Sequence, residues 1–398
     1  MPPRRRILAV TPFLPSRASR HGGGQLCHAL LHALAEQAEV HLCALATSAE
    51  LDHVADLSPA LASTRVVVRR AKSTHGSFAW KRTMLRRYVR GLNVTTAKYG
   101  SGTMRRVVES AIARIEPDAV LAELLLAGRF LPRQTNALRV VTDHEAATYV
   151  PARVLPLGLG IDRDRRLWRN IVQSVTARAE VLQALNSADA ETLSELTGRE
   201  VIVRHPALEL PAEPVKAPDG DLAVGFLGDH SHGPNPEASR FLATEVLPRL
   251  RKLEPSALLR IAGPGSQEAL AELSDSEGLE LLGPIPDTAS FFAGVHSLAA
   301  PLFSGLGTRM KVLDSLRHGV PVVSNNLGLR GIDAGEPAVF SSQDADEIAS
   351  NCVRLFRDQE LGSRARTAAR EHAEAHLDPS RVAAAQLQTI EIALESRD

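Results

Sequence analysis

The stretch that decides the fold is residues 300–331, which read APLFSGLGTRMKVLDSLRHGVPVVSNNLGLRG. It begins with a small-residue loop at 304–308, and a helix is expected from about Arg309, with Val312, Leu313 and Leu316 as its apolar stripe. Gly319 and Pro321 end that helix and lead into a short apolar strand at 320–323. Short apolar strands, glycine-containing loops and helices that alternate in this way are typical of doubly wound α/β domains.

The junction between this loop and its helix has the chemistry of an anion site. Glycines let bare backbone N–H groups approach an anion, and the positive end of a helix dipole favours negative charge there. Arg309 and Lys311 place two cations in the same first turn, where the dipole disfavours them. An anion between the cations and the N–H groups explains this arrangement, and Asp314, one turn further on, could accept hydrogen bonds from sugar hydroxyls. The alternative is a glycine-rich turn with solvated charges.

At this point the motif resembles a known family. The matching residues are Pro301, Gly305, 307–309, 311–314, 319–323 and Gly331. They resemble the signature of group 1 glycosyltransferases, which are retaining, metal-independent enzymes of the GT-B fold, and most closely the branch whose donor loop reads GGGTRLKVLEA. The resemblance implies that the loop, Gly305, Leu306, Gly307 and Thr308, holds a donor diphosphate and that Asp314 holds the ribose.

Two positions depart from the family pattern. Asp314 stands where the family usually has Glu, so the side chain is one methylene shorter. Leu306 stands where many relatives carry an acidic residue, so a pair of carboxylates is not available at this site.

Length and composition indicate a soluble two-domain protein. A chain of 398 residues is too long for one ordinary core and suits two domains. The 46 basic and 46 acidic residues balance, which argues against a nucleic-acid partner. Three widely spaced cysteines with no CxxC motif indicate free thiols in a reducing compartment. The apolar run near the N-terminus breaks at Thr11-Pro12, too short for a signal peptide, so a cytoplasmic location is expected.

The N-terminal part opens with a strand, a glycine run and a helix. An apolar run at 7–10 predicts a buried parallel strand, and a second apolar strand is expected at 40–45. Between them, Gly23 and Gly24 followed by His28 resemble the GGxxxH motif of many group 1 enzymes. The resemblance implies that these glycines face the donor phosphates. The alternative is a flexible loop that leads into a helix.

Residues 65–98 are basic and irregular, with aromatic and apolar side chains interleaved among lysines and arginines. A basic amphipathic helix of this kind can lie on anionic lipid, so a peripheral membrane contact is one interpretation. Recognition of an anionic acceptor is a second. The third, which the residues favour, is a solvated helix packed on its own domain. RNA binding fits less well, because no RNA motif accompanies the segment.

A strand expected at 138–142 ends in Asp143, His144 and Glu145. The carboxyl ends of strands carry the site in doubly wound folds, so topology places His144 well. The resemblance implies that His144 approaches the donor sugar, with Glu145 contacting the acceptor or orienting His144. A structural histidine is the alternative. Metal binding here is not expected, because no other cluster of ligands accompanies these residues.

Residues 209–220, ELPAEPVKAPDG, have the composition of an interdomain linker. The second domain opens with a buried strand ending at Gly228, followed by Asn235-Pro236, which predicts an N-cap and first helical residue. Many relatives carry Arg and Lys in this loop; here Arg309 and Lys311 are expected to supply that charge. His230 is a secondary candidate for a nucleotide contact, and the resemblance places Ile285 at the nucleotide base.

The sequence thus predicts an α/β protein of the GT-B type, with two doubly wound Rossmann-like domains facing a cleft. The expected parts are an acceptor-binding domain at 1–208, the linker at 209–220, a nucleotide-sugar-binding domain at 221–375, and a helix at 376–398 packing across both. The expected activity is transfer of a sugar from a nucleoside diphosphate to a hydroxyl or amine with retention of anomeric configuration. His144, Arg309 and Lys311 are the expected catalytic residues, with no cofactor and no metal ion. A monomer or homodimer is expected.

Two other functions remain open at this stage. A nucleotide-sugar 2-epimerase shares the fold but needs acid–base carboxylates, a case that Leu306 weakens. A catalytically degenerate GT-B auxiliary protein is compatible with both departures from the motif. Neither the donor sugar nor the acceptor is readable from these residues.

Overall fold

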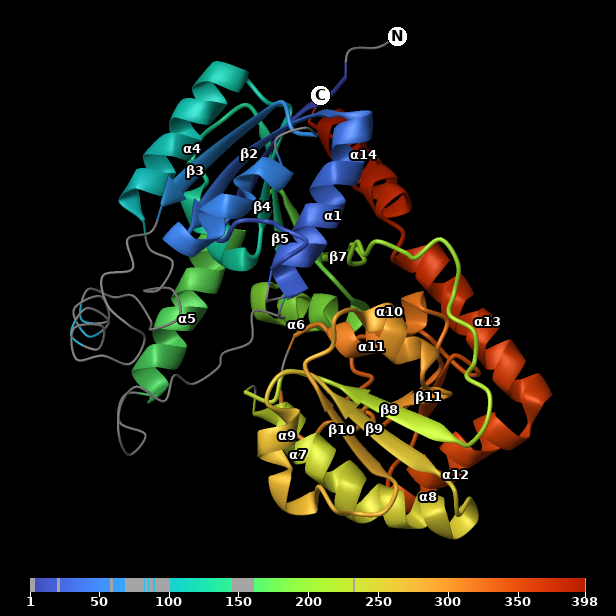
Figure 1. Ribbon diagram of the computed structural model, residues 1–398. Coiled ribbons are helices and arrows are strands. Elements are labelled where there is room, and N and C mark those ends of the chain that lie inside the picture. The colour runs from blue at the N-terminus through green and yellow to red at the C-terminus, as the bar shows by residue number, and fades with distance from the viewer. Residues whose placement is uncertain are drawn as a thin grey trace. The chain divides into compact units, whose positions relative to one another are not determined.

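The computed structural model describes residues 4–19, 22–57, 60–68, 82, 85, 89, 101–144, 161–231, 233–305 and 307–397 (Figure 1). The chain divides into two compact units. Unit 1 comprises Met1–Leu208 and Pro379–Asp398, and unit 2 comprises Glu209–Asp378.

Unit 1 is built on a seven-stranded, fully parallel sheet in the order β3-β2-β1-β4-β5-β6-β7. Its strands are β1 (Arg6–Thr11), β2 (Glu39–Ala46), β3 (Ser63–Val68), β4 (Ala119–Glu123), β5 (Leu138–Asp143), β6 (Val181–Ala184) and β7 (Ile202–Val203). Apart from the exposed Arg6, the central strands β1 and β4 are buried along their whole length, because helices cover both faces of the sheet.

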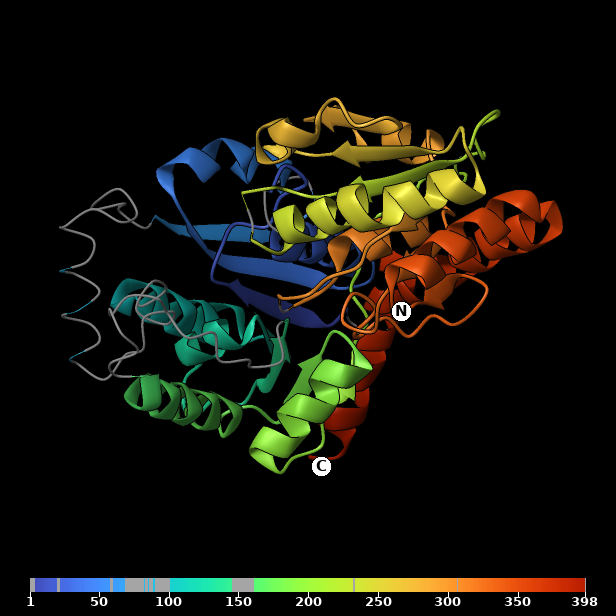
Figure 2. The same cartoon turned by 90° about the horizontal axis from the view of Figure 1, so that it is seen from below.

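Two layers of helices enclose this sheet. The helices are α1 (Gly22–Gln37), α4 (Gly102–Ile115), α5 (Ile161–Thr176), α6 (Ser187–Thr197) and α14 (Pro379–Glu395), with the 3₁₀ helices η1 (Ser48–Asp56) and η2 (Leu125–Phe130). α1 and α14 pack together on one face over one apolar cluster. α4, η2 and α5 cover a second cluster on the other face, where Figure 2 shows α4 and α5 on the same side of the sheet.

Unit 2 has a six-stranded parallel sheet in the order β10-β9-β8-β11-β12-β13. Its strands are β8 (Ala223–Leu227), β9 (Leu258–Ala262), β10 (Leu279–Gly283), β11 (Ser297–Ala299), β12 (Val322–Ser324) and β13 (Val339–Ser341). Its helices are α7 (Pro234–Phe241), the π-helical turn η4 (Leu242–Val246), α8 (Leu247–Leu253), α9 (Ser266–Ala269), η5 (Ala271–Leu273), α10 (Thr288–Ala293), α11 (Met310–Arg317), α12 (Ala345–Arg357) and α13 (Gln359–His376). The prediction of two doubly wound α/β sheets is confirmed.

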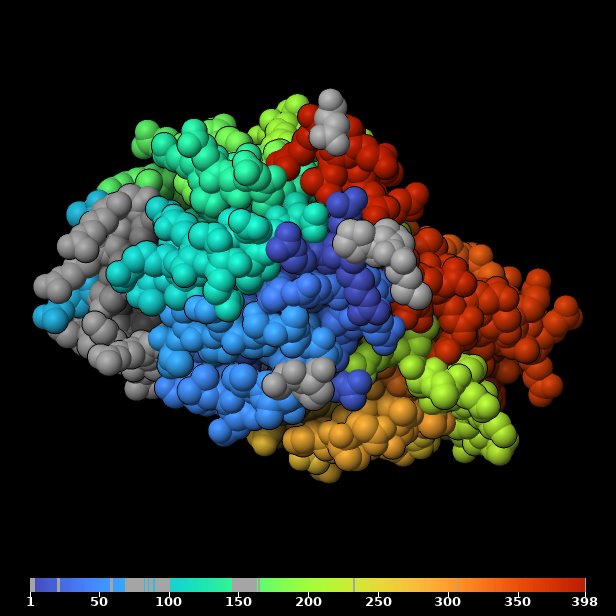
Figure 3. Space-filling view, turned by 90° about the horizontal axis from the view of Figure 1, so that it is seen from above, coloured from blue at the N-terminus to red at the C-terminus, as the bar shows by residue number. Residues whose placement is uncertain are grey.

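The expected linker and terminal helix differ in detail from the structure. Residues 209–220 belong to unit 2, where Val215 donates its N–H to His318 O (3.0 Å) and accepts a hydrogen bond from Arg366 Nη2 (2.7 Å). α13 ends in unit 2, and the chain then enters unit 1 as α14. α14 buries Val382 and Ile390 beside α1, and its deep-red atoms lie beside the blue of the first strands in Figure 3.

In each sheet the strand order reverses direction at one point. In unit 1 the first strand, β1, has β2 on one side and β4 on the other. In unit 2 the first strand, β8, has β9 on one side and β11 on the other. In doubly wound proteins, ligands bind at the carboxyl ends of the strands beside such a reversal.

Two glycines allow the loops of unit 2 to meet closely. Gly228 donates its N–H to Ala262 O (3.0 Å), which carries the pairing of β8 and β9 beyond their ends. Gly263 has a φ of 115°, and a Cβ at this position would lie 2.0 Å from Gly228 O. No side chain fits there, so Gly263 holds the ends of β8 and β9 at their observed separation.

The variant Gly263→Ala should therefore lower the free energy of unfolding by about 3 kcal/mol or more, measured by urea denaturation. Gly220→Ala is the matched control, because Gly220 has a φ of 93° but nothing within 4 Å of the added Cβ. That control variant should lower the free energy of unfolding only by the backbone strain, about 1 kcal/mol. Equal losses in the two variants would show that the close approach at Gly263 is unimportant.

Candidate functional site

The loop between β11 and α11 has the backbone conformation that its glycines predict. Gly305 and Gly307 have φ values of 101° and 84°, which side-chain-bearing residues rarely adopt. The Thr308 hydroxyl is buried and has no hydrogen-bond partner in the described part of the chain. α11 begins at Met310, as expected from the sequence, and has no side-chain cap at its first turn. The loop thus brings glycine backbone and a buried hydroxyl to the positive end of a helix.

Arg309 is buried at the start of α11, only 7% exposed. Its Nε and Nη2 donate to Leu327 O at 3.2 and 3.1 Å, and Nη2 also reaches Gly305 O at 3.3 Å. The guanidinium therefore fixes the glycine loop and at the same time places a permanent positive charge beside it.

Lys311 lies on the first turn of α11 and contacts two uncharged groups. Its Nζ donates to Asn235 Oδ1 at 2.6 Å and lies 3.9 Å from the centroid of the Phe226 ring. Burial, together with the neighbouring charge of Arg309, lowers the pKa of Lys311 to about 7. An anion next to Nζ would favour the charged form and raise the pKa again.

Asn235 has a role that the sequence analysis did not predict. α7 begins at Pro234, with Gly233 before it, so the interpretation of Asn235-Pro236 as N-cap and first helical residue is wrong. The buried Asn235 amide instead donates to Asp229 O (2.7 Å) while its oxygen accepts from Lys311. Gly228 leaves room for it, since a Cβ there would lie 2.7 Å from Asn235 Cγ. Asn235 thus ties the loop after β8 to the loop after β11.

His230 lies in the same loop after β8 and is buried. Its Nε2 hydrogen-bonds with Ser239 Oγ on α7 at 2.7 Å, and Nδ1 has no partner among the described residues. Burial lowers the pKa of His230, and the positive charge of Lys311 acts in the same direction. The ring is therefore anchored through Nε2.

The two remaining predicted residues of unit 2 lie further along the same edge. Asp314 accepts a hydrogen bond from Arg317 Nε at 2.7 Å, and Arg317 also donates to Glu209 O and Thr288 Oγ1. Ile285 follows β10 and packs against the apolar cluster that contains Val312. Leu306 lies outside the described residues.

In unit 1 the predicted glycines form the first turn of α1 rather than a loop before it. Gly24 O accepts a hydrogen bond from Ser16 N at 3.2 Å. A Cβ on Gly23 would lie 3.4 Å from the Phe13 ring and 3.6 Å from His144 Nδ1. His144 follows β5, as predicted, and the structure therefore brings it to the start of α1. Glu145 and most of the basic segment at 65–98 lie outside the described residues.

His144 belongs to a buried polar network centred on Glu123, the last residue of β4. Glu123 Oε2 accepts from His144 Nε2 at 2.9 Å and from Arg204 Nη2 at 2.7 Å. All three residues are at most 6% exposed. Burial alone would raise the pKa of Glu123, but the Arg204 charge and the hydrogen bond from His144 hold it below its usual value. Glu123 is therefore ionised at neutral pH.

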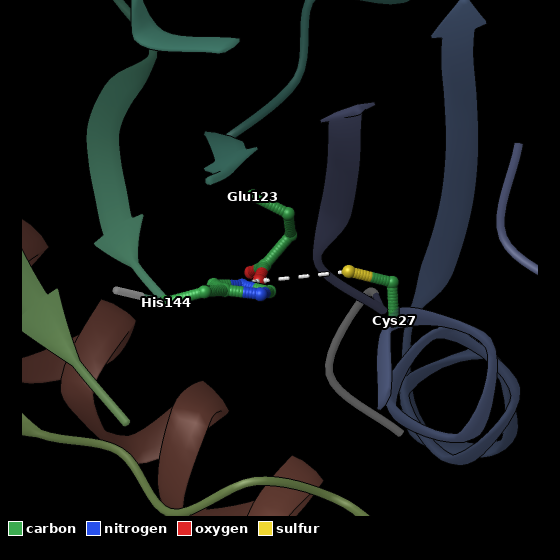
Figure 4. A group of neighbouring side chains, drawn as sticks. All are labelled: Cys27, Glu123 and His144. Carbon is green, nitrogen blue, oxygen red and sulfur yellow. Dashed lines mark hydrogen bonds and ion pairs between the residues drawn. The ribbon is translucent and has the colours of Figure 1, made fainter. Parts of the chain in front are cut away.

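Cys27, Glu123 and His144 lie close enough to resemble a metal site, as Figure 4 shows. Cys27 Sγ is 3.9 Å from Glu123 Oε2, and the potential ligand atoms of the three residues lie within 4.8 Å of one another. Two observations argue against a cation. Arg204 already places a positive charge on the Glu123 oxygen, and burial and the Glu123 charge raise the pKa of Cys27 well above its usual value. A metal ion needs a thiolate and an available carboxylate, so these residues do not fit one.

Glu123, Arg204 and Asn235 are three site residues that were not predicted from the sequence. Glu123 carried a usable signal, because it ends the strand at the reversal point of the sheet. Arg204 follows a strand of two residues and carried none. Its contact with Glu123 joins residues 81 positions apart.

Comparisons with known proteins found a family model and several similar solved structures. Residues 221–358 match the family model "Glycosyl transferases group 1". None of the curated proteins matches the chain. Among solved structures, sucrose-phosphate synthase from Thermosynechococcus elongatus has a TM-score of 0.69 and 13% identity, covering 99% of this chain and 100% of that one.

Two further solved structures cover almost the whole chain. HepE of Anabaena, in complex with UDP and glucose, has a TM-score of 0.63 and 14% identity, covering 97% of this chain and 99% of its own. A glycosyltransferase from Rickettsia africae has a TM-score of 0.62 and 12% identity, with 98% and 99% covered. The fold is therefore GT-B, as the sequence predicts. Among the described residues, no helix has the length and apolar character needed to cross a membrane.

Replacement of Lys311 by methionine should stabilise the protein in a pH-dependent way. The pKa falls from 10.5 to about 7 on folding, so between these values the unfolded chain binds more protons and stability rises with pH. The neutral side chain of Lys311→Met avoids the cost of burying charge, on the order of a few kcal/mol below about pH 7. We expect its melting temperature to exceed that of the wild type most at about pH 6 and to converge with it by about pH 10.

Lys252→Met, at an exposed position on α8, is the matched control and should change stability little at any pH. A pH-independent effect of Lys311→Met would contradict the lowered pKa.

Proposed function

We propose that the protein is a retaining group 1 glycosyltransferase, which moves a sugar from a nucleoside diphosphate to a hydroxyl or amine acceptor. The observation that carries this proposal is the placement of Arg309 and Lys311 at the positive end of α11. Both lie beside a glycine loop with positive φ values, within the residues that match the family model. Two buried cations and a helix N-terminus are suited to a diphosphate.

The departing diphosphate gains charge as the glycosidic bond breaks, and fixed donors aimed at that charge lower the barrier. Arg309, Lys311, the N–H groups of Gly305 and Gly307 and the hydroxyl of Thr308 supply those donors in our proposal. Arg309 is held by backbone carbonyls and needs no reorganisation during the reaction. No metal ion is required by this mechanism, because the charge comes from the protein.

The remaining candidates bind the rest of the donor. Arg317 occupies one carboxylate oxygen of Asp314, and we assign the other oxygen to a ribose hydroxyl. Gly228, His230 and the backbone near Ile285 line the edge of the sheet where the nucleoside would lie. Asn235 hydrogen-bonds both Asp229 O and Lys311 Nζ. A ligand bound at one of these two loops would therefore also affect the position of the other loop.

In unit 1, His144 is proposed to contact the donor sugar, with Gly23 and Gly24 near the phosphates and Glu145 near the acceptor. The leaving phosphate takes the acceptor proton, so the proposal needs no separate general base and no cofactor. HepE was solved with UDP, with UDP-glucose, and with UDP and glucose. UDP-glucose is therefore the first donor to test, with a cytoplasmic role in natural-product, polysaccharide or glycolipid synthesis as the proposed setting.

A nucleoside diphosphate should raise the melting temperature, because it binds only the folded state. We expect one of UDP, GDP, dTDP and ADP to give a clear shift that EDTA does not change. Lys311→Met should lose most of the shift, and Lys252→Met should keep it. A shift abolished by EDTA would overturn the metal-free site. No shift with any nucleotide would favour a catalytically degenerate auxiliary protein.

Arg309→Ala should lower kcat by about 10²–10³-fold with a smaller change in donor KM, because its charge matters most in the transition state. The measurement is steady-state transfer with the donor identified above. Arg309→Lys keeps the charge but loses the paired hydrogen bonds to Leu327 O, and should lie between wild type and alanine. Equal turnover in Arg309→Ala would contradict the assigned role. Isomerisation of the donor in the absence of acceptor would instead indicate an epimerase.

A further inference from the structure

Glu123 is a buried carboxylate that the proposed reaction does not use. It lies at the carboxyl end of β4, beside the point where the strand order of unit 1 reverses. Its oxygens accept hydrogen bonds from groups on several elements: Arg204 Nη2, His144 Nε2, Thr142 Oγ1 and Cys27 Sγ, at 2.7, 2.9, 3.4 and 3.9 Å. A carboxylate with this many donors has a fixed position and a fixed ionisation state.

The network determines where the proton of a neutral His144 ring resides. An ionised carboxylate can only accept hydrogen bonds, so the His144 nitrogen that contacts Glu123 must carry hydrogen. That nitrogen is Nε2. In the neutral imidazole the lone pair is then on Nδ1. Arg204 maintains this state by holding Glu123 ionised.

Nδ1 is the ring nitrogen of His144 that does not contact Glu123. It is buried and has no hydrogen-bond partner in the described part of the chain. Its neighbour on the first turn of α1 is Gly23, where an added Cβ would lie 3.6 Å from Nδ1. The ring as a whole is 5% exposed, so its orientation is set by packing as well as by Glu123.

We propose that Glu123 and Arg204 are positioning residues, which fix the tautomer and orientation of His144 so that Nδ1 accepts a hydrogen bond from a hydroxyl group of the donor sugar. The identity of the hydroxyl rests on the proposed glycosyl transfer, whereas the geometry of His144 and Glu123 does not depend on it. A site built to accept a hydroxyl proton discriminates strongly against a ligand that lacks the group, because a buried acceptor would remain unpaired.

A purely structural ion pair is the competing explanation. Removal of Glu123 alone would leave Arg204 buried without its counter-charge, which destabilises a protein strongly. The informative variant is therefore the neutral pair Glu123→Gln with Arg204→Met. An amide at position 123 can either donate or accept, so it no longer dictates which nitrogen of His144 carries the proton.

The first measurement is the protonation of the two ring nitrogens of His144 in the full-length protein. Long-range ¹H–¹⁵N correlation of histidine-labelled protein distinguishes a protonated from a bare nitrogen, and loss of signals in His144→Asn assigns them. We expect a protonated Nε2 and a bare Nδ1 in the wild type, and partly averaged shifts in the neutral double variant. A protonated Nδ1 with a bare Nε2 in the wild type, or unchanged shifts in the double variant, would overturn the inference.

The second measurement separates positioning from stability. The double variant should lower kcat by about 10²-fold, the loss that misplacement of a reacting group produces, with donor KM changed much less. Glu180→Gln is the matched control, because Glu180 also binds two arginines in unit 1, Arg139 and Arg397. It should leave kcat and the His144 shifts unchanged. An equal fall in kcat in this control would support a structural role only.

If the double variant does not fold, two single variants replace it. Arg204→Lys keeps the charge and should retain the wild-type tautomer with a smaller loss of kcat. Wild-type kcat and wild-type chemical shifts in Arg204→Met would contradict the role of Arg204. Failure of the proposed function would look different. A wild type that shows the expected tautomer but transfers no sugar from any nucleotide donor would refute glycosyl transfer and leave the geometry of His144 standing.

Discussion

The constraint on which the site depends is the cost of burying charge at the carboxyl end of a parallel sheet. Strands that end together bring their loops to one edge, where helix dipoles and unpaired backbone groups already create a strong local field. Charged side chains placed there lose hydration, and only nearby partners offset the loss. The two units of this protein meet that cost in opposite ways.

In unit 1 the compensation is internal. Glu123 and Arg204 neutralise each other, and the hydrogen bonds from His144 and Thr142 fill the remaining capacity of the carboxylate. Such a network has little to gain from an additional ion, which is why its resemblance to a metal cluster is misleading. What it can offer a ligand is an imidazole ring held in one orientation. In unit 2, Lys311 is buried against an amide and an aromatic ring, neither of which carries a net charge. An anion would complete that environment.

The difference also explains what the sequence could reveal. The loop at 304–308 and the cations that follow it are contiguous in the sequence, so they can be recognised as a motif. α11 begins where this motif predicts. His144 could be placed because a strand end is a local feature. The contacts that tune these residues are long-range: Lys311 and Asn235 are 76 positions apart, and Glu123 and Arg204 are 81 apart. Asn235 was misread because a cap is the commonest local reason for Asn before Pro, whereas here tertiary contacts determine its role.

The lowered pKa of Lys311 links anion binding to protonation. Near neutral pH the empty site exists in both forms, charged and neutral. A diphosphate at this site would favour the charged form, so its binding would take up a proton in the molecules that lack one, by the same linkage that couples stability to pH. Its departure would lower the pKa of Lys311 again and release that proton. Lys311, held by Asn235 and Phe226, would thus be charged most fully when the ligand is present. This limits the free-energy cost of burying its charge in the empty site and does not weaken ligand binding.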